Sequence, residues 1–236
     1  MFDYKYEMHT HSKACSACAS SSSEDIVRKA KERGYAGVFF TNHFYFGNSA
    51  IDRSLPWADF VDAYYADYLA AKKVGDSIGV DVFFGIEEAY NGGKEVLIYG
   101  IDPKVLANEN GFPRFSLKEM SDFVRKNGGL FAAAHPFRNR SYIKKPGEAP
   151  DPSFFDAIEV HNQFNDKDGI ENKKAHDFAK WNQLIMISGG DIHNVDSFGN
   201  TGLAFPYRIE SFEMLKNALY TKQYKLIING ELHNPD

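Results

Sequence analysis

Imidazole and carboxylate side chains recur in this sequence at spacings that suit metal binding. His9 and His11 are separated by one residue, and so are Asp191 and His193. In a β-strand, residues i and i+2 point to the same face, so each pair could hold one ion. Imidazole and carboxylate ligands, with no thiolate required, suit zinc, manganese or iron. The two pairs therefore predict divalent metal chemistry.

Four further candidate ligands end predicted strands elsewhere in the chain: His43, Glu87, His135 and His161. A lone histidine at the end of a strand is more often a core or loop residue than a metal ligand. Here, however, six of the eight histidines lie at strand ends, together with two acids that follow Gly-Ile and Gly-Gly. We therefore predict one metal site that gathers its ligands from six strands. His176, in a predicted helix, and His233, in the tail, are expected to stay outside it.

Two cysteines follow the first histidine pair, as a Cys15-x-x-Cys18 motif. Two cysteines make no disulfide framework, and in the cytosol such a pair is usually reduced, catalytic or metal-binding. A separate zinc site would need two more thiol or imidazole ligands. A thioredoxin-like role would need the motif at the start of a helix. Two interpretations stay open: a loop whose cysteines act as small apolar residues, or a substitute metal ligand near His43 and His193.

An alternation of strands and helices must position these residues. Apolar, β-rich runs predict strands at 4–11, 36–43, 81–87, 95–101, 130–135, 157–161, within 184–193, at 202–205 and at 225–229, with a turn at 91–93. Helical patterns occupy 21–33, 57–78, 116–127, 168–181 and 211–220, with Ser21 and Glu24 as a possible capping box. Continuous apolar strands indicate a parallel sheet covered on its outside. About seven such units favour a closed α/β barrel, with 1–236 as a single domain. The carboxyl ends of its strands would face one rim, where distant ligands meet.

Composition narrows the classes of protein that the chain could represent. Of its 236 residues, 43% are hydrophobic and 25% charged, which is typical of a globular protein with a core. The formal net charge of -5 disfavours a dedicated nucleic-acid-binding surface. No apolar run approaches a membrane span, and the start MFDYKYE lacks the apolar region of a signal peptide. We expect a cytoplasmic protein with no membrane partner.

Ordered motifs in this chain resemble those of the polymerase and histidinol phosphatase (PHP) superfamily. HTHS at 9–12, TNH at 41–43, AAHPFR at 133–138 and GGDIH at 189–193 occur in this order, with GIEE at 85–88 and EVHN at 159–162 between them. The resemblance covers essentially the whole chain. It implies a distorted (β/α)7 barrel with two or three divalent ions, of zinc, manganese or iron, at the carboxyl rim of the strands.

The resemblance also implies a role for each ligand. His9, His11, Glu87 and Asp191 would hold the first ion, Glu87 would bridge to a second ion held by His135 and His161, and His43 and His193 would hold a third. Two positions depart from the family pattern. Asn42 stands where the family often has Asp, and Ser16 stands where a His or Asp usually supports the third ion. The third site is therefore expected to be supported by a thiolate, weaker, or vacant.

The hypothesis for function is metal-dependent hydrolysis of phosphate esters, in a small-molecule phosphomonoesterase similar to histidinol phosphatase. A metal-activated hydroxide would attack phosphorus, with Asp191 and His193 orienting it or assisting proton transfer. Arg138 could contact a phosphate oxygen of the small phosphorylated substrate. The aromatic run at 43–46 could line the pocket, although packing at the rim is the simpler interpretation. The alternatives are a nuclease or oligonucleotide phosphodiesterase, a metal-dependent C–N hydrolase, and a non-catalytic metal-binding module.

Overall fold

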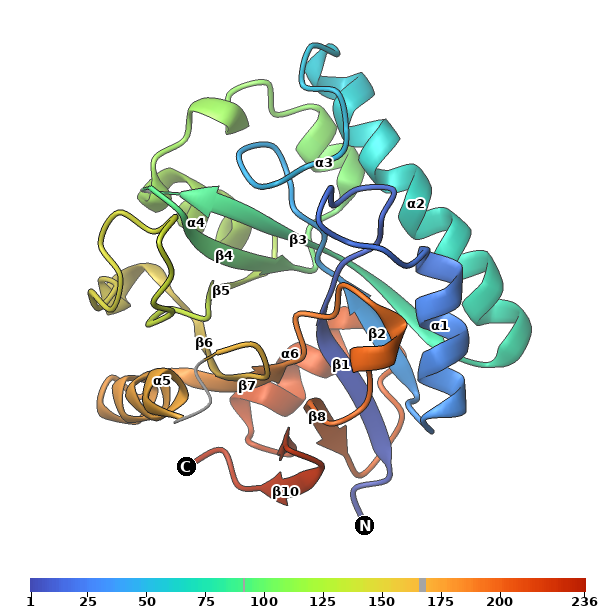
Figure 1. The fold of residues 1–236 in the computed structure, drawn as a ribbon, viewed down its shortest axis with the longest axis vertical. Coiled ribbons are helices and arrows are strands. Elements are labelled where there is room, and N and C mark those ends of the chain that lie inside the picture. Colours follow the sequence, from blue (N-terminus) through green and yellow to red (C-terminus); the bar gives the residue numbers. More distant parts are fainter. Residues whose placement is uncertain (91, 166–168) are drawn as a thin grey trace.

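The computed structural model describes residues 1–90, 92–165 and 169–236, and within them the strands form one sheet (Figure 1). The strands are β1 (Tyr4–Thr10), β2 (Gly37–Phe40), β3 (Asp81–Tyr90), β4 (Lys94–Tyr99), β5 (Leu130–Ala134), β6 (Ala157–Asn162), β7 (Ile185–Gly189), β8 (Gly202–Phe205), β9 (Lys225–Ile228) and β10 (Glu231–His233). The α-helices are α1 (Ser23–Glu32), α2 (Trp57–Ile78), α3 (Pro103–Ala107), α4 (Leu117–Lys126), α5 (Ile170–Trp181) and α6 (Phe212–Tyr220). The predicted turn residue Asn91 and the predicted helix start at residue 168 lie outside the described residues.

The sheet follows the order β10-β9-β8-β1-β2-β3-β4-β5-β6-β7 and curls back on itself. The segment after β7 returns to the end of β1, where the Ile192 N–H donates to the His9 carbonyl and the Ile192 carbonyl accepts the His11 N–H. This contact brings the two sides of the sheet together. The predicted α/β fold class, a distorted barrel, is confirmed.

Strand direction is mixed, so the predicted parallel sheet is wrong in part. The pairs β1–β2, β2–β3, β5–β6 and β6–β7 are parallel, but β4 runs antiparallel to both β3 and β5. The strands β8, β9 and β10 are also paired antiparallel. The connection between β3 and β4 is too short for a parallel crossover, which needs a dozen or more residues. All six residues of β4 are buried, and this gave it the apolar pattern of a parallel strand.

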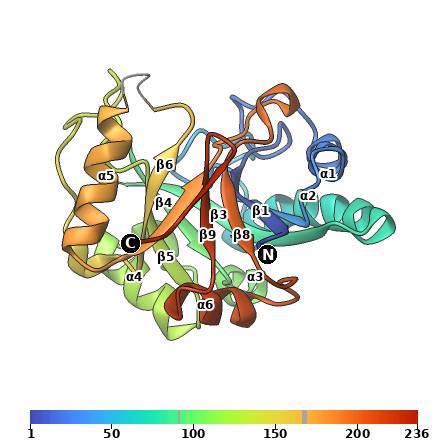
Figure 2. The same cartoon turned by 90° about the horizontal axis from the view of Figure 1, so that it is seen from below.

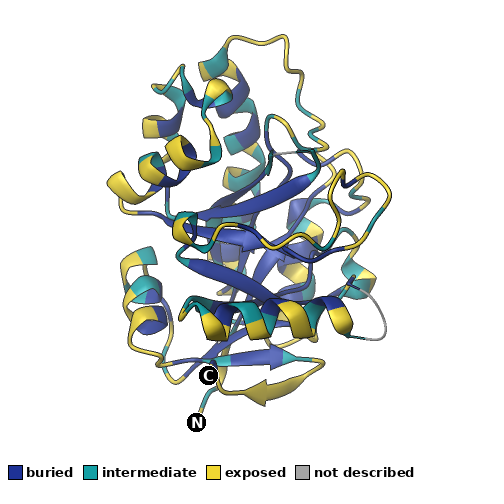
Figure 3. Cartoon of the chain, turned by 90° about the vertical axis from the view of Figure 1, so that its left-hand side faces the viewer, coloured by how far each residue is buried: buried dark blue, intermediate teal, exposed yellow. Residues whose placement is uncertain are grey.

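The helices lie on the outside of the sheet and most strands are buried, whereas the edge strand β10 is exposed (Figures 2 and 3). Helices α1 and α2 pack on each other and on β2 and β3, while α4 packs on β5 and α5 on β6. Helix α4 begins with a capping box, in which Ser116 accepts the Glu119 N–H and the Glu119 carboxylate accepts the Ser116 N–H. Helix α1 is capped by Ser22, which accepts the Asp25 N–H, so the predicted capping box of Ser21 and Glu24 is wrong. Among the described helices, none combines the length and apolar character that a membrane span requires.

Candidate metal centre

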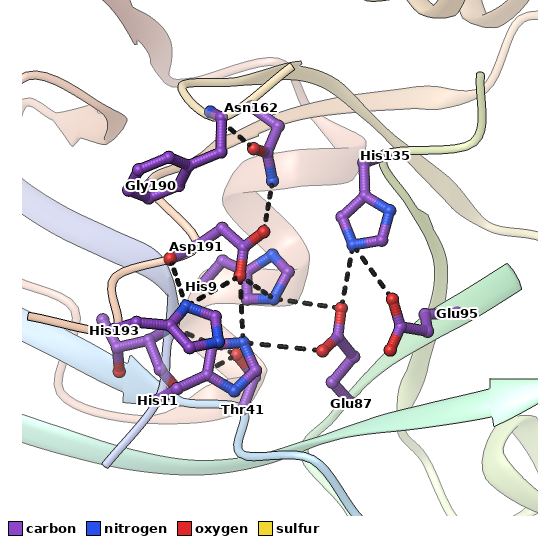
Figure 4. Close-up of polar contacts among 12 residues, drawn as sticks. His9, His11, Thr41, Glu87, Glu95, His135, Asn162, Gly190, Asp191 and His193 are labelled. Atoms are coloured by element: carbon purple, nitrogen blue, oxygen red, sulfur yellow. Dashed lines mark hydrogen bonds and ion pairs between the residues drawn. The ribbon is translucent and has the colours of Figure 1, made fainter. Parts of the chain in front are cut away.

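Side chains from strands distant in sequence converge at one end of the sheet (Figure 4). They form four groups whose ligand atoms lie within 4.8 Å of one another: His9, His11 and Asp191; His9, Glu87 and His135; His43, Glu87 and Glu95; and His11, His43 and His193. Seven of the eight ligands predicted from the sequence belong to these groups. The carboxyl-end rule accounts for this, since β1, β2, β3, β5 and β7 are parallel strands that deliver their ends to the same rim.

Glu87 lies at the centre of the four groups. Its Oε1 is 3.2 Å from His9 Nε2 and 3.0 Å from His135 Nε2, and its Oε2 is 2.8 Å from His43 Nδ1. Burial favours the neutral acid, but the positive charge of His9 and His43 keeps the pKa of Glu87 well below its usual value. The neighbouring Glu88 points elsewhere and accepts backbone N–H groups, including that of Phe46. Glu87, and not Glu88, therefore faces the candidate ligands in two of the four groups, and its role as a bridging ligand stays a prediction.

Several nitrogen and oxygen atoms of this cluster are buried without a hydrogen-bond partner among the described residues. They are His9 Nε2, His11 Nε2, His43 Nδ1, Glu87 Oε2 and His161 Nε2. A buried polar atom without a partner costs about 1–3 kcal/mol, so natural proteins rarely keep several in one place. Lone pairs of imidazole and carboxylate that face one another suit divalent cations. The donor set therefore fits the metal ions that the sequence predicts.

Glu159 is a site residue that the sequence analysis did not identify. Its Oε1 lies 2.9 Å from His9 Nδ1, and its Oε2 accepts the His135 N–H at 2.8 Å. A carboxylate on one ring nitrogen of a histidine fixes the tautomer and leaves the other nitrogen free for a metal. Burial lowers the pKa of His9, but the charges of Glu159 and Glu87 outweigh this and raise it well above its usual value.

Backbone strain marks two of the candidate ligands. His135 and Asp191 have φ angles of 28° and 53°, in a region that side-chain-bearing residues seldom adopt. Gly189, two residues before Asp191, lies so close to its neighbours that a Cβ there would be 2.3 Å from Glu159 Oε1 and 2.7 Å from His9 Cβ. The chain thus accepts an unfavourable local conformation in order to place these two side chains in the cluster.

His161 is the predicted ligand that the structure leaves outside the close groups. Its Nε2 is buried without a hydrogen bond, and its Nδ1 faces Asn172 Nδ2 at 3.1 Å. The pairing of β6 with β7 is irregular between Glu159 and His161. Such a bulge breaks the two-residue alternation that would put both side chains on one face. The role of His161 as a ligand of the second ion stays a prediction.

Glu95 takes a place in the cluster that the sequence analysis did not give it. It lies 3.4 Å from His135 Nε2 and 3.5 Å from His43 Nδ1. If β4 ran parallel to its neighbours, Glu95 would be near the start of the strand and would lie at the end of the sheet opposite the candidate ligands. Because β4 is antiparallel, its first residues lie instead at the rim where the other strands end.

Arg138 is buried against Asp191 at the wall of a pocket of about 420 Å³. Its Nη2 donates to Asp191 Oδ2 at 2.7 Å and to Asn162 Oδ1 at 2.9 Å, and its Nε donates to Asn165 Oδ1 at 3.2 Å. Burial raises the pKa of Asp191, but the charges of His9 and Arg138 hold it well below its usual value. The pocket is also bordered by His43, Glu87, Glu95, Asp191 and His193. Contact of Arg138 with a substrate stays a prediction.

A second, larger pocket of about 760 Å³ adjoins the first and shares Phe46, Ala89 and Gly93 with it. Its other lining residues are mostly apolar and include Tyr90, Phe115, Leu117, Met120 and Phe154. Of the aromatic run at 43–46, Phe44 is fully buried in the core, as the simpler interpretation expected. Phe46 lines both pockets.

Comparison with known proteins bears on this geometry. A model of the PHP domain matches residues 7–136, which is more than half of the chain. The chain belongs to the PHP family. No curated protein sequence matches it.

Solved structures similar to this PHP chain share its fold at low sequence identity. A two-domain protein from Bacteroides vulgatus, containing a predicted PHP-like metal-dependent phosphoesterase, has a TM-score of 0.72 and 16% identity over 97% of this chain. The chain spans 66% of that protein. A lesion-specific endonuclease from Pyrococcus furiosus has a TM-score of 0.60 and 14% identity, over 94% of this chain and 57% of that one. An amidohydrolase from Chromobacterium violaceum with bound sulfate has a TM-score of 0.54 and 15% identity, over 80% and 87%.

The two departures from the PHP pattern lie side by side in the structure. Asn42 Oδ1 accepts the Ser12 N–H at 2.6 Å and the Ser16 hydroxyl at 3.1 Å, while its Nδ2 donates to Asp67 at 3.4 Å. Ser16 Oγ lies 3.0 Å from His11 Nδ1 and accepts the His43 N–H at 2.9 Å. Ser16 therefore supports His11 and His43 directly, and Asn42 supports them through Ser16.

The two cysteines of this loop have different surroundings. Cys15 is buried in the core, its thiol donates to the Tyr64 carbonyl, and burial raises its pKa. Cys18 is exposed, and its Sγ lies 3.1 Å from His193 Nε2. Partial burial raises the pKa of Cys18, but hydrogen bonds with His193 and His43 lower it to about 6. The interpretation of the motif's cysteines as small apolar residues therefore holds for Cys15. Cys18 lies beside His193 instead.

Proposed function

We propose that this PHP protein hydrolyses phosphate monoesters of small molecules and requires divalent metal ions for the reaction. The observation that carries the proposal is the set of donor groups around Glu87, next to a guanidinium in one pocket. When bound, clustered divalent ions lower the pKa of water, neutralise phosphate oxygens and hold the nucleophile and leaving group in line. The residues that would hold them are those predicted from the sequence, together with Glu95.

The protein's own contribution is to fix charges before the substrate arrives. Arg138 is locked by Asp191, Asn162 and Asn165, so its guanidinium would meet a phosphate oxygen without first losing side-chain entropy. Asp191 is kept ionised by its neighbours, which suits a metal ligand that also orients the attacking water. His193 borders the same pocket, and its catalytic role stays a prediction.

The apolar pocket supports a particular kind of substrate. Phosphate would lie among the charged residues of the smaller pocket, and the leaving group would extend past Phe46 towards Tyr90, Phe115 and Met120. A ring-bearing ester fits such walls better than a sugar phosphate, because burial of the apolar ring against them lowers the free energy of binding. The net charge of -5 gives no general attraction for a polynucleotide. A cytoplasmic location and a single domain over 1–236 complete the proposal.

Two other reactions are compatible with the fold. One solved structure of similar fold is a lesion-specific endonuclease, and another is an amidohydrolase. Both are hydrolases, so likeness of fold does not separate the three activities. The chemistry of the substrate therefore has to be tested directly.

The test is a substrate panel on protein loaded separately with zinc, manganese and iron. It would compare p-nitrophenyl phosphate, naphthyl phosphate, histidinol phosphate, glycerol phosphate, bis-p-nitrophenyl phosphate, short oligonucleotides and acyl amides. We expect the aryl monoesters to have the highest kcat/KM, with activity lost in Glu87→Gln and retained in Glu88→Gln, the adjacent buried acid that faces away. Preference for oligonucleotides over every monoester, or hydrolysis of amides alone, would overturn the proposal.

A further inference from the structure

We propose that Cys18 supplies a thiolate to a metal ion held by His43 and His193, in place of the His or Asp that the family usually has near Ser16. The inference rests on the proposed metal centre and is independent of the proposed esterase activity. It would add a sulfur ligand to the group of His11, His43 and His193, because none of the four close donor groups contains a cysteine on its own.

The geometry places the thiol beside His193 in a pocket that His43 also lines. Cys18 Sγ lies 3.1 Å from His193 Nε2, and Cys18, His43 and His193 border the same pocket. His193 Nδ1 already lies 2.8 Å from the Asp191 carbonyl oxygen, which leaves Nε2 as the nitrogen that faces the thiol. The rings of His11, His43 and His193 are near neighbours, with centroid separations of 4.2–5.8 Å. Sulfur and imidazole donors thus meet in one place.

An independent feature of the cluster points to a ligand at this place. His11 is fully buried, and its Nε2, which lies 3.2 Å from Asp191 Oδ1, makes no hydrogen bond among the described residues. The ligand nitrogens of His11, His43 and His193 lie within 4.8 Å of one another. A thiol next to histidines could simply be a surface contact, but a buried imidazole nitrogen that makes no hydrogen bond and faces other ligand atoms calls for a cation.

The other two candidates in the loop are already occupied. Ser16 Oγ is engaged by the His11 ring, the His43 N–H and Asn42. Cys15 faces the Tyr64 carbonyl in the core. Cys18 lines the same pocket as His43 and His193, so an ion can reach it from solvent.

A thiolate changes which ion the site selects. Thiolate and imidazole together favour zinc or cobalt over manganese, whereas the carboxylate-rich groups around Glu87 accept harder ions. The centre would then hold a softer ion at Cys18 than beside Glu87.

Cobalt(II) spectroscopy tests the proposal without any activity assay. A cobalt–thiolate bond gives an intense near-ultraviolet charge-transfer band that imidazole and carboxylate ligands do not give. Wild type and the matched control Cys15→Ala should both show the band on titration with cobalt, and Cys18→Ser should lose it. Bound cobalt should also protect Cys18 from alkylation by iodoacetamide, whereas Cys18 in the metal-free protein should react. Mass spectrometry measures both.

Three outcomes would overturn the inference. The band could persist in Cys18→Ser, or wild type could bind cobalt and show no band, or alkylation of Cys18 could proceed equally with and without cobalt. If wild type bound no cobalt and no zinc at all, the proposed metal centre would fail together with this inference. If wild type bound cobalt but showed no thiolate band, this inference alone would fail. The proposed esterase function would stand, because it depends on the groups around Glu87.

Discussion

Replacing Glu159 by Gln should weaken metal binding without unfolding the protein. The carboxylate serves three donors at once, since Oε1 faces His9 Nδ1 at 2.9 Å, and Oε2 accepts the His135 N–H at 2.8 Å and the Asn162 Nδ2 at 3.1 Å. Glutamine offers one oxygen and one NH₂ group, so one of these donors must face an NH₂. If the NH₂ faces His9, the ring proton moves to Nε2, the atom that lies 3.2 Å from Glu87. If it faces His135, that N–H loses its acceptor.

The size of the effect follows from the bond that is lost. A buried hydrogen bond to a charged group contributes about 1.5–3 kcal/mol. Since about 1.4 kcal/mol corresponds to a factor of ten, the affinity for the ion at His9 should fall about 10- to 100-fold. Loss of outer partners of metal-binding histidines has effects of about this size in other proteins.

The assay is a competition titration of zinc and manganese against a chromogenic chelator, with thermal unfolding of the metal-free protein measured alongside. Glu88→Gln is the matched control, because Glu88 is equally buried and also accepts backbone N–H groups, but it touches none of the candidate ligands. The reasoning would be refuted if Glu159→Gln bound both metals within about twofold of wild type, or if Glu88→Gln lost as much affinity.

Four further predictions concern stability. Asn42→Asp should lower the free energy of unfolding, measured in urea, by about 1–3 kcal/mol. The substitution removes the hydrogen-bond donor to Asp67 and places two carboxylates side by side. Adding Asp67→Asn should restore most of the lost stability. Burial raises the pKa of Asp67 above its usual 3.8, so the stability that Asp67 contributes is present below this pH and is lost as pH rises through its folded-state pKa. The difference in unfolding free energy between wild type and Asp67→Asn, measured on the metal-free protein, should therefore decrease as pH rises above 3.8. Gly189→Ala should cost about 1–3 kcal/mol and weaken zinc binding, since its Cβ would overlap Glu159 and His9; an unchanged unfolding midpoint would contradict this. Removing bound metal with a chelator should lower the Tm. Where the free ion exceeds its Kd 100-fold, the lost stability corresponds to about 2.7 kcal/mol, and calorimetry with and without chelator measures the difference.

The sequence was enough to predict most of the centre because the carboxyl ends of parallel strands meet at one rim. His9, Glu87, His135 and Asp191 lie more than 180 residues apart at the extremes, yet all belong to the close donor groups. What patterns could not show was strand direction. β4 is buried on both faces, so its sequence resembles that of a parallel strand, in which Glu95 would lie at the opposite end of the sheet.

Glu159 and His161 show a second limit. Two residues apart in a predicted strand, they would share a face, and a carboxylate beside a predicted ligand is a signal that could have been used. The irregular pairing with β7 separates them, so that Glu159 reaches His9 while His161 lies outside the close groups. Bulges and the positive φ angles of His135 and Asp191 depend on packing around the site, and hydrophobic periodicity carries no trace of them.

The departures from the family pattern in the first loop are consistent with one another. Asn42 can sit against Asp67 because its amide donates a hydrogen bond, whereas an Asp there would repel that carboxylate. The amide oxygen then holds Ser16, and Ser16 in turn supports the rings of His11 and His43. A metal ligand at position 16 would have to give up those contacts, so a donor in this loop has to come from another residue. Cys18, two residues further along and next to His193, is where the structure offers one.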